Sequence, residues 1–253
     1  MSEARAGFSE PGLWQLVESG DYRADLSTWS DLAAKHGGPV LDLGCGIGRV
    51  SHYLSRLGFT TFGLDRDPDL IADFDRSRPT GAPAGFARDV ADLADPQSPL
   101  RGRRFALVIA PQQLVQILGG REARMSLFEA LPGLLEPNGL AAFAICGELP
   151  EVDIEYPGVP PDLREVDGWI HSSQPVTIDS NPDSVTARRL RQSLSPEGTS
   201  TRSDDAVTLD RLDRSTIERE LSAAGLRPSG TGLIEPTDRH MGSTLILARP
   251  PLS

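Results

Sequence analysis

The sequence has one lysine, two cysteines and no long run of positive charge. Lys35 is the only lysine among the 25 basic residues of a 253-residue chain, and the 36 acidic residues give a formal net charge of -11. No more than two basic residues are consecutive anywhere. A chain that binds phosphate groups needs a positively charged face. We therefore expect neither nucleic acid nor an anionic membrane among its partners.

Long apolar segments are also missing. No window approaches the roughly 18 apolar residues of a membrane-spanning helix, and the sequence that starts at Met1 lacks the apolar stretch of a secretory signal. We expect a cytoplasmic protein. Two cysteines, Cys45 and Cys146, are too few for a disulfide framework. The histidines at positions 36, 52, 171 and 240 lack metal-ligand spacing, so we expect no metal site.

Short β-branched apolar runs alternate with helical stretches from residue 39 onward. This alternation is typical of a parallel sheet with helices on both faces. The expected strands are 39–43, 60–64, 84–88, 105–110, 140–146 and 243–248. The expected helices are 49–57, one that begins at Pro68, 121–135 and 214–224. The sequence thus predicts an α/β fold.

A stretch of different character interrupts this alternation. Residues 148–183 contain nine acidic residues and one arginine, a local net charge of -8. Residues 175–178, 184–193 and 199–209 alternate as hairpin strands do, with turn residues between them. We interpret 148–209 as a β-rich cap inserted into the α/β core. The acidic part is either a solvated loop or a surface that faces a bound substrate.

A glycine-rich loop follows the first expected strand. The sequence Val40–Gly48 runs from a strand into a loop whose glycines, at 44, 46 and 48, allow positive φ and close approach of a ligand. A dinucleotide fingerprint would need a third glycine at position 49, where Arg49 stands. Asp65 ends the second strand, where a carboxylate can accept both hydroxyls of a ribose. The loop therefore favours a nucleoside-containing cofactor other than a dinucleotide.

These residues resemble the class I S-adenosylmethionine-dependent methyltransferases. The resemblance is carried by five segments in order, Leu41–Gly48, Gly63–Asp65, Ala87–Val90, Phe105–Gln113 and Leu134–Leu140. It implies a Rossmann-like, mostly parallel sheet of seven strands with helices on both faces and a β-rich cap inserted after strand five.

The resemblance also implies how the chain is divided. We expect a single methyltransferase domain over residues 1–253. Its expected parts are N-terminal lid helices at 1–37, a cofactor-binding core at 38–147, the cap at 148–209, and a final helix and strands at 210–253.

The resemblance implies a set of residues that bind S-adenosylmethionine. Asp42 would anchor the glycine loop, Asp65 would bind the ribose, and Asp89 with Val90 would meet the adenine. The expected cofactor-binding set is Asp42, Gly44, Cys45, Gly46, Gly48, Asp65, Arg66, Asp89, Val90, Ala110, Pro111 and Gln112.

The methyl acceptor is harder to identify. The sequence Pro111-Gln112-Gln113 departs from the Asn/Asp-Pro-Pro-Tyr of family members that methylate adenine or glutamine. We therefore expect a small-molecule acceptor with an oxygen, nitrogen or carbon nucleophile, neutral or cationic if the acidic residues of the cap face it. The sequence indicates no oligomeric state.

Two histidines are candidates for a general base. His171 lies in the cap and His240 precedes the last strand, and for each a structural or surface role is the alternative. His36 and His52 are expected at the surface. Two other interpretations of the chain stay open, an NAD-dependent dehydrogenase and a non-catalytic cofactor-binding or interaction protein on the same fold.

Overall fold

A computed structural model describes residues 7–95, 97–238 and 240–251. The chain divides into two compact units. Unit 1 comprises Met1–Tyr22 and Glu148–Arg211, and unit 2 comprises Arg23–Gly147 and Leu212–Ser253. Residues 1–6 of the expected lid and residues 252–253 of the last expected segment lie outside the described residues.

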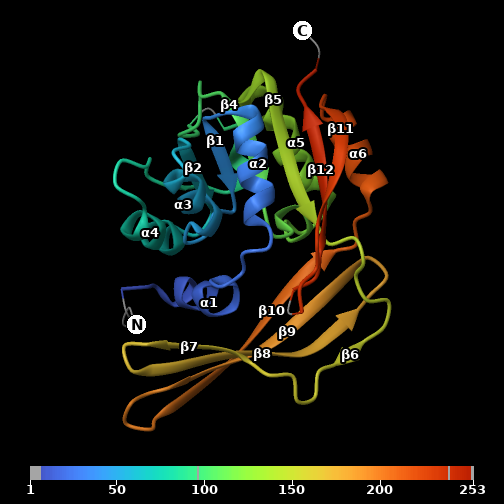
Figure 1. Ribbon diagram of the computed structural model, residues 1–253. Coiled ribbons are helices and arrows are strands. Elements are labelled where there is room, and N and C mark those ends of the chain that lie inside the picture. Colours follow the sequence, from blue (N-terminus) through green and yellow to red (C-terminus); the bar gives the residue numbers. More distant parts are fainter. Residues whose placement is uncertain (1–6, 96, 239, 252–253) are drawn as a thin grey trace. The chain divides into compact units, whose positions relative to one another are not determined.

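Unit 2 contains a seven-stranded sheet within the described residues, in the order β11-β12-β5-β4-β1-β2-β3 (Figure 1). Adjacent strands from β3 to β5 pair in parallel, and β12 runs antiparallel to both β5 and β11. The strands are β1 Val40–Leu43, β2 Thr61–Asp65, β3 Phe86–Ala87, β4 Phe105–Ala110, β5 Leu135–Ile145, β11 Arg227–Ile234 and β12 Ser243–Arg249. The expected mostly parallel, seven-stranded sheet is confirmed.

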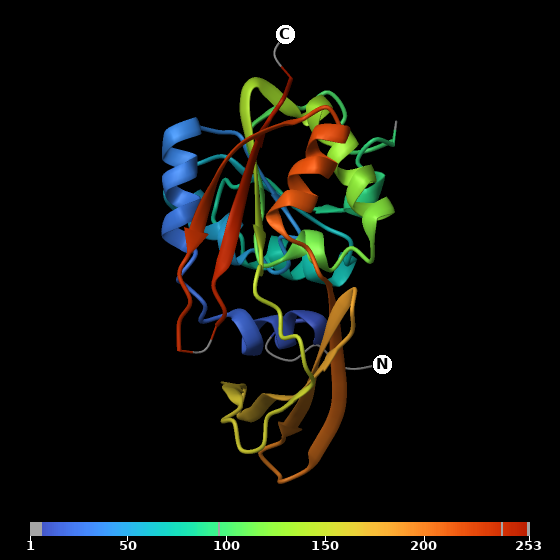
Figure 2. The same ribbon diagram turned by 90° about the vertical axis from the view of Figure 1, so that its right-hand side faces the viewer.

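Helices cover both faces of this sheet, as the α/β pattern predicts. They are α2 Leu26–His36, α3 Arg49–Arg56, α4 Pro68–Ser77, α5 Arg121–Leu134 and α6 Arg214–Ala223, with short 3₁₀ turns η1 Val90–Asp92 and η2 Leu114–Gln116. Figure 2 shows α2 and α6 on opposite sides of the sheet. In β4, Leu107 and Ile109 pack with α2 and α3, whereas Val108 and Ala110 pack with α5 and α6.

Unit 1 is built around an antiparallel sheet in the order β10-β9-β8-β6, with β7 also paired to β8. Its elements are α1 Glu10–Ser19, β6 Ile154–Glu155, β7 Asp162–Val166, β8 Trp169–Ser180, β9 Ser184–Leu194 and β10 Ser200–Asp210. The β8-β9-β10 meander confirms the expected β-rich insertion after strand five. Helix α1 packs on this sheet. The ring centres of Trp14 in α1 and His171 in β8 lie 5.9 Å apart.

The two N-terminal helices, both assigned to a lid from sequence, fall in different units. Helix α1 belongs to unit 1, whereas α2 belongs to unit 2. Trp29 and Ala33 of α2 are fully buried in the core cluster that also contains Val40. Helix α2 is therefore part of the sheet's core packing. The single-domain description of residues 1–253 stays a prediction beside this division into units.

No helix of the described residues is long and apolar enough to cross a membrane.

Candidate functional site

The predicted cofactor residues of unit 2 follow the carboxyl ends of its parallel strands. The glycine loop follows β1, Asp65 ends β2, Asp89 comes two residues after β3, and Pro111 follows β4. Since β1 pairs with both β2 and β4, these segments reach the same edge of the sheet. This edge is where ligands bind in open α/β sheets. The structure thus brings together the segments that the sequence predicted.

The glycine loop needs its glycines for two reasons. Gly44, Gly46 and Gly48 have φ values of 65°, 53° and 93°, in the region that favours glycine. A Cβ at Gly44 would lie 2.9 Å from the Leu114 Cδ1, and one at Gly48 would lie 2.4 Å from the His52 Cε1. The loop therefore packs closely against neighbouring side chains, and larger residues would force it open.

Asp65 ties this loop to the end of β2. Its Oδ2 accepts a hydrogen bond of 2.9 Å from the Gly46 N–H, and its Oδ1 accepts one of 3.0 Å from the Asp67 N–H. Burial raises the pKa of Asp65, and these two N–H donors oppose the rise. A carboxylate has about four acceptor positions. Asp65 therefore keeps acceptor capacity for two hydroxyl groups after it has fixed the loop.

Asp42 anchors the loop from inside the protein. Its side chain is 1% exposed, and its Oδ2 accepts a 2.6 Å hydrogen bond from the Ser51 hydroxyl in the first turn of α3. Burial raises the pKa of Asp42 to about 7, while the Ser51 hydrogen bond lowers it. Asp42 therefore couples β1 to α3, in keeping with its predicted role as the anchor of the loop.

Cys45 is a packing residue of the loop. Its side chain is 7% exposed and clusters with Ile71 and Phe74. Burial raises the pKa of the Cys45 thiol well above its usual range, and the Asp42 and Asp65 carboxylates add to the rise. A thiol with a raised pKa is a poor nucleophile. Both cysteines of the chain are buried, and neither forms a disulfide.

The segment after β3 is capped by an aspartate. The Asp89 Oδ1 accepts a 2.9 Å hydrogen bond from the Ala91 N–H, which starts η1. Val90 is 5% exposed and packs in the main core cluster. Arg66, after β2, is exposed. The part of Asp89 and Arg66 in cofactor binding stays a prediction, and core packing accounts for the burial of Val90.

The chain leaves β4 in a strained conformation. Ala110 and Pro111 are buried, and Gln112 and Gln113 have φ values of 52° and 60°, which few residues other than glycine adopt. Such strain persists only where surrounding contacts impose it and is common at functional sites. One such contact is the 2.8 Å hydrogen bond that the Gln113 Nε2 donates to the Ser243 Oγ in β12.

An ion pair that sequence reasoning missed holds the start of α3. Arg49 donates to both carboxylate oxygens of Asp25, at 2.6 and 2.7 Å, and the Trp29 indole N–H donates to the Asp25 Oδ2 at 2.9 Å. Bidentate pairs of this kind fix geometry strongly. The available signal was Arg49 itself, which stands where a dinucleotide fingerprint would have glycine.

The histidines differ in environment. The prediction that His52 lies at the surface is wrong, because it is 4% exposed and its ring lies 4.5 Å from that of Phe74, between α3 and α4. Burial lowers the pKa of His52 to about 4. His36 is half-buried at the end of α2.

The two catalytic candidates lie in different units. His171 in unit 1 is fully buried, its Nδ1 is 2.8 Å from the Ser193 Oγ, and its ring stacks at 6.4 Å on Trp169. This environment favours the structural alternative for His171. His240 in unit 2 is half-buried in a turn that its N–H closes by donating to the Thr237 Oγ1 at 3.0 Å.

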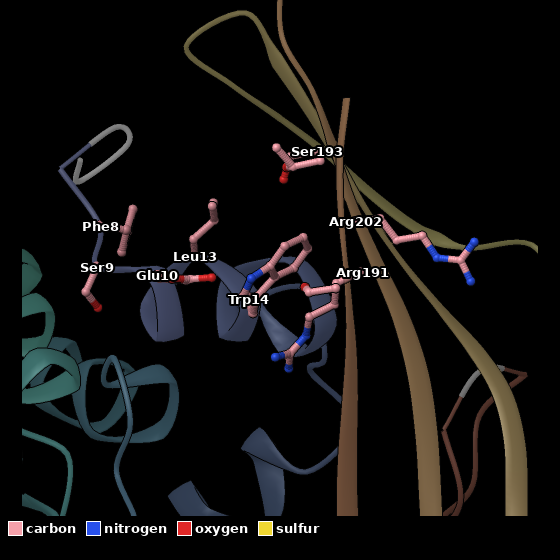
Figure 3. Close-up of a pocket in the computed structure, with 10 residues that line it drawn as sticks. Phe8, Ser9, Glu10, Leu13, Trp14, Arg191, Ser193 and Arg202 are labelled. Atoms are coloured by element: carbon pink, nitrogen blue, oxygen red, sulfur yellow. The ribbon is translucent and has the colours of Figure 1, made fainter. Parts of the chain in front are cut away.

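Unit 1 also contains a cavity of about 260 Å³. Figure 3 shows it between the start of α1 and strands β9 and β10, with Arg191 extended beside Trp14 and Arg202 turned away. The Arg191 guanidinium lies 5.3 Å from the Trp14 ring centre and pairs with Glu18 and Asp205. Four hydroxyl side chains contribute to the lining, those of Ser9, Ser193, Thr201 and Ser203. This lining suits a small hydroxylated molecule.

The edge formed by the glycine loop and Asp65 fits S-adenosylmethionine. The cofactor carries a ribose diol, an amino acid group and an adenine. The carboxylate of Asp65, which keeps acceptor capacity beyond its hydrogen bonds from Gly46 and Asp67, suits the diol. Among the described residues no cluster of three His, Cys, Asp or Glu side chains could hold a metal ion.

Comparisons with known proteins point to the same chemistry. The family model described as "Methyltransferase domain" matches residues 40–139. A search of curated proteins finds no match.

Solved structures share the fold of this chain. The CcbJ methyltransferase from Streptomyces caelestis is 17% identical with a TM-score of 0.70, and the alignment covers 99% of this chain and 100% of that one. CalS10 from Micromonospora echinaspora, an amino pentose methyltransferase solved with bound S-adenosylmethionine, is 19% identical with a TM-score of 0.69 and coverages of 94% and 96%. The sugar N-methyltransferase KedS8 from Streptoalloteichus is 16% identical with a TM-score of 0.69 and coverages of 94% and 92%.

Residues 40–139 therefore match a methyltransferase domain, and the chain shares the fold of solved methyltransferases, one of them with bound S-adenosylmethionine. These findings agree with the family, the enzyme class and the cofactor that the five motifs predicted. A dehydrogenase or a non-catalytic protein is correspondingly disfavoured.

Proposed function

We propose that this enzyme transfers the methyl group of S-adenosylmethionine to an amine nitrogen of a small hydroxylated molecule, such as an amino sugar, in the cytoplasm. The single observation that carries the cofactor part is the glycine loop closed onto Asp65 by the Gly46 N–H. This arrangement joins the first two motifs of the methyltransferase domain at one edge of the sheet. The nitrogen and sugar parts of the proposal go beyond it and rest on other observations.

The amino sugar is supported by three observations. Two of the solved structures with this fold are described as an amino pentose methyltransferase and a sugar N-methyltransferase. The cavity of unit 1 is lined by four hydroxyl side chains and by Trp14, and a Trp ring next to hydroxyl groups suits the mixed surface of a sugar. An amine is also the neutral or cationic acceptor that the acidic composition of residues 148–183 favours.

The residues of unit 2 have distinct proposed roles. Asp65 accepts hydrogen bonds from the ribose hydroxyls, Asp89 accepts one from the adenine amine, and the Gly44–Gly48 loop lies along the amino acid part. Ala110, Pro111 and Gln112 border the sulfonium, whose methyl group is the electrophile that the cofactor supplies when bound. Because methyl transfer is an in-line displacement, correct positioning provides most of the rate enhancement.

His240 is the proposed general base. An amine acceptor reacts as the free base, so a group that removes its proton near neutral pH increases the reactive fraction. His240 is half-buried, whereas His171 is fully buried against Ser193 and two indole rings. We expect His240→Ala to lower kcat by about 100-fold or more without changing cofactor affinity. An unchanged kcat would show that His240 has the alternative, surface role.

Calorimetric titration with S-adenosylhomocysteine tests the cofactor site. Asp65→Asn keeps the shape but removes the charge that binds the ribose, so we expect affinity to fall by about 30-fold or more, or roughly 2–3 kcal/mol. Asp69→Asn, an exposed change in the first turn of α4, is the matched control and should leave the affinity unchanged. Equal affinities for the two variants would mean that another carboxylate binds the ribose.

A methylation assay tests the acceptor. Incubation with S-adenosylmethionine and a panel of amino sugars, paired with the same sugars carrying hydroxyl in place of the amine, should give methylated product only from the amines. Products from the hydroxyl series alone would replace N-methylation by O-methylation. Cofactor binding without any product from either series would instead favour the non-catalytic alternative.

A further inference from the structure

A second cavity of unit 2 lies at the opposite edge of the sheet from the glycine loop. It has a volume of about 520 Å³. Pro39, Thr60 and Arg104, which immediately precede β1, β2 and β4, are among its lining residues. The six residues of β4 span about 20 Å. This cavity is therefore separate from the proposed cofactor site, which lies at the carboxyl ends of the same strands.

The floor of this cavity is aromatic. Phe59, Phe62 and Phe105 line it, and the half-buried Phe59 and Phe62 provide its exposed ring surface, whereas Phe105 is fully buried. The Phe62 and Phe105 rings meet edge to face with centroids 5.7 Å apart, and Phe62 also lies parallel to Phe86 at 6.1 Å. Such rings offer a flat apolar surface to another ring. A planar ligand would remove this surface from water.

Two arginines stand beside these rings. The Arg103 guanidinium carbon lies 5.0 Å from the Phe62 centroid and 5.8 Å from that of Phe86, a cation–π geometry. Arg104 donates to the Pro132 carbonyl at 2.8 Å and to the Leu135 carbonyl at 3.2 Å, near the end of α5. Both side chains are thus held in defined positions at the cavity.

Neither arginine is neutralised by an acid among the described residues. The ion pairs found between described residues join other basic and acidic groups, and none of them involves Arg103 or Arg104. With Arg101 these residues form the sequence Arg-Gly-Arg-Arg, three positive charges within four positions of a chain of net charge -11. The cavity therefore combines fixed positive charge with an aromatic floor.

We propose that this cavity binds a small planar anion, an aromatic ring that carries a carboxylate or a phosphate. The ring lies against Phe59 and Phe62, and the anionic group pairs with the Arg103 guanidinium, with Arg104 close by. The volume falls within the range of about 300–1,000 Å³ that small-molecule sites have. Arginine forms paired hydrogen bonds to both carboxylate and phosphate, so it suits either head group.

Calorimetric titration of the whole protein with 2-naphthoate tests the site, with 2-naphthamide as the neutral analogue and 2-naphthyl phosphate as the alternative head group. We expect naphthoate or naphthyl phosphate to bind at millimolar concentration or below and naphthamide to bind at least about 10-fold more weakly. The stronger of the two anions identifies the head group. Absence of binding by both anions, or equal binding of the amide, would overturn the proposal.

Two variants assign the binding to this cavity. Arg103→Gln should weaken binding of the better anion by at least about 10-fold. Arg101→Gln, an exposed change in the same segment that does not line the cavity, should leave it within about 2-fold. Both variants should bind S-adenosylhomocysteine as the wild type does, which shows that they are folded. Equal losses in the two variants would mean that the anion binds elsewhere.

Discussion

The two units of this protein differ in the interactions that stabilise each of them internally. In the described residues, the three hydrophobic core clusters all belong to unit 2, where the two faces of the parallel sheet are covered by helices. In unit 1, α1 buries Leu13, Trp14 and Val17, and charged and hydroxyl groups also join it to the sheet. Glu18 of α1 accepts from Arg191 at 2.7 and 2.9 Å and from the Ser173 hydroxyl at 2.7 Å.

Charge is divided just as unevenly. Unit 1 contains 17 of the 36 acidic residues but only 7 of the 25 basic ones, a net charge of -10 out of -11. Some of its acids are paired, as Asp162 with Arg189 and Asp179 with Arg188. The acidic segment is therefore neither a plain solvated loop nor wholly available to an acceptor. Unit 2 is nearly neutral and its fold rests on apolar burial.

The largest expected effect is a loss of apolar packing in unit 2. Phe143 is fully buried and meets Phe128 edge to face with centroids 5.3 Å apart. Phe143→Ala should lower the free energy of unfolding by about 3–5 kcal/mol. Leu163→Ala in unit 1, whose side chain is 62% exposed, is the control and should change it by about 0.5 kcal/mol or less. Urea unfolding followed by circular dichroism measures both. Equal losses would contradict the difference in burial between the two side chains.

The pH dependence of stability should reveal two buried groups of unit 2 that act in opposite directions. The native pKa of Asp42 is about 7 against 3.8 for its ordinary value, so its contribution is present below about pH 4 and lost as the pH rises toward 7. The native pKa of His52 is about 4 against 6.5, so its contribution is present above pH 6.5 and lost as the pH falls toward 4. The two trends offset each other in the wild type.

Single substitutions separate these trends. The free energy of unfolding of Asp42→Asn, taken relative to that of the wild type, should increase by up to about 4 kcal/mol as the pH rises from about 4 to 7. The free energy of unfolding of His52→Gln, again relative to the wild type, should increase by up to about 3 kcal/mol as the pH falls from about 6.5 to 4. Thermal unfolding at a series of pH values measures the slopes. Slopes of the same sign for the two variants would contradict the burial of one of the groups.

The smallest expected effect is in the charged network of unit 1. Glu18 and Arg191 are 20% and 18% exposed, and Glu18→Gln leaves Arg191 with Asp205 as its remaining ion-pair partner. We expect the free energy of unfolding to fall by about 1–2 kcal/mol, and we expect this loss to shrink in high salt. Glu165→Gln, exposed on β7 of the same unit, is the control and should have almost no effect. A loss that does not depend on salt would mean that Glu18 acts through packing alone.

The sequence predicted most of unit 2 because local patterns determine it. Strand β4 was expected at 105–110 and is found there, since its six residues are all buried and form one apolar run. Strand β11 was not expected, because Arg227–Ile234 contains two glycines and a proline and only Ile234 is buried. Strand β7, with one buried residue, was missed for the same reason.

Contacts between distant positions limited the prediction of the site. The glycine loop, Asp42 and Asp65 follow a motif, so they could be named from sequence. The Asp25–Arg49 pair joins residues 24 positions apart, and the burial of His52 depends on how α3 faces α4. The buried environment of His171 was equally hidden, because Ser193 comes from the next strand and Trp14 from α1.

The central claim is that the edge of unit 2 formed by the glycine loop and Asp65 holds the cofactor. Hydrogen exchange of the backbone amides with and without S-adenosylhomocysteine tests it directly. We predict slower exchange on binding in residues 43–49, 65–67 and 88–92. Unchanged exchange in these segments, with slowing confined to unit 1 or to residues 100–105, would contradict the claim.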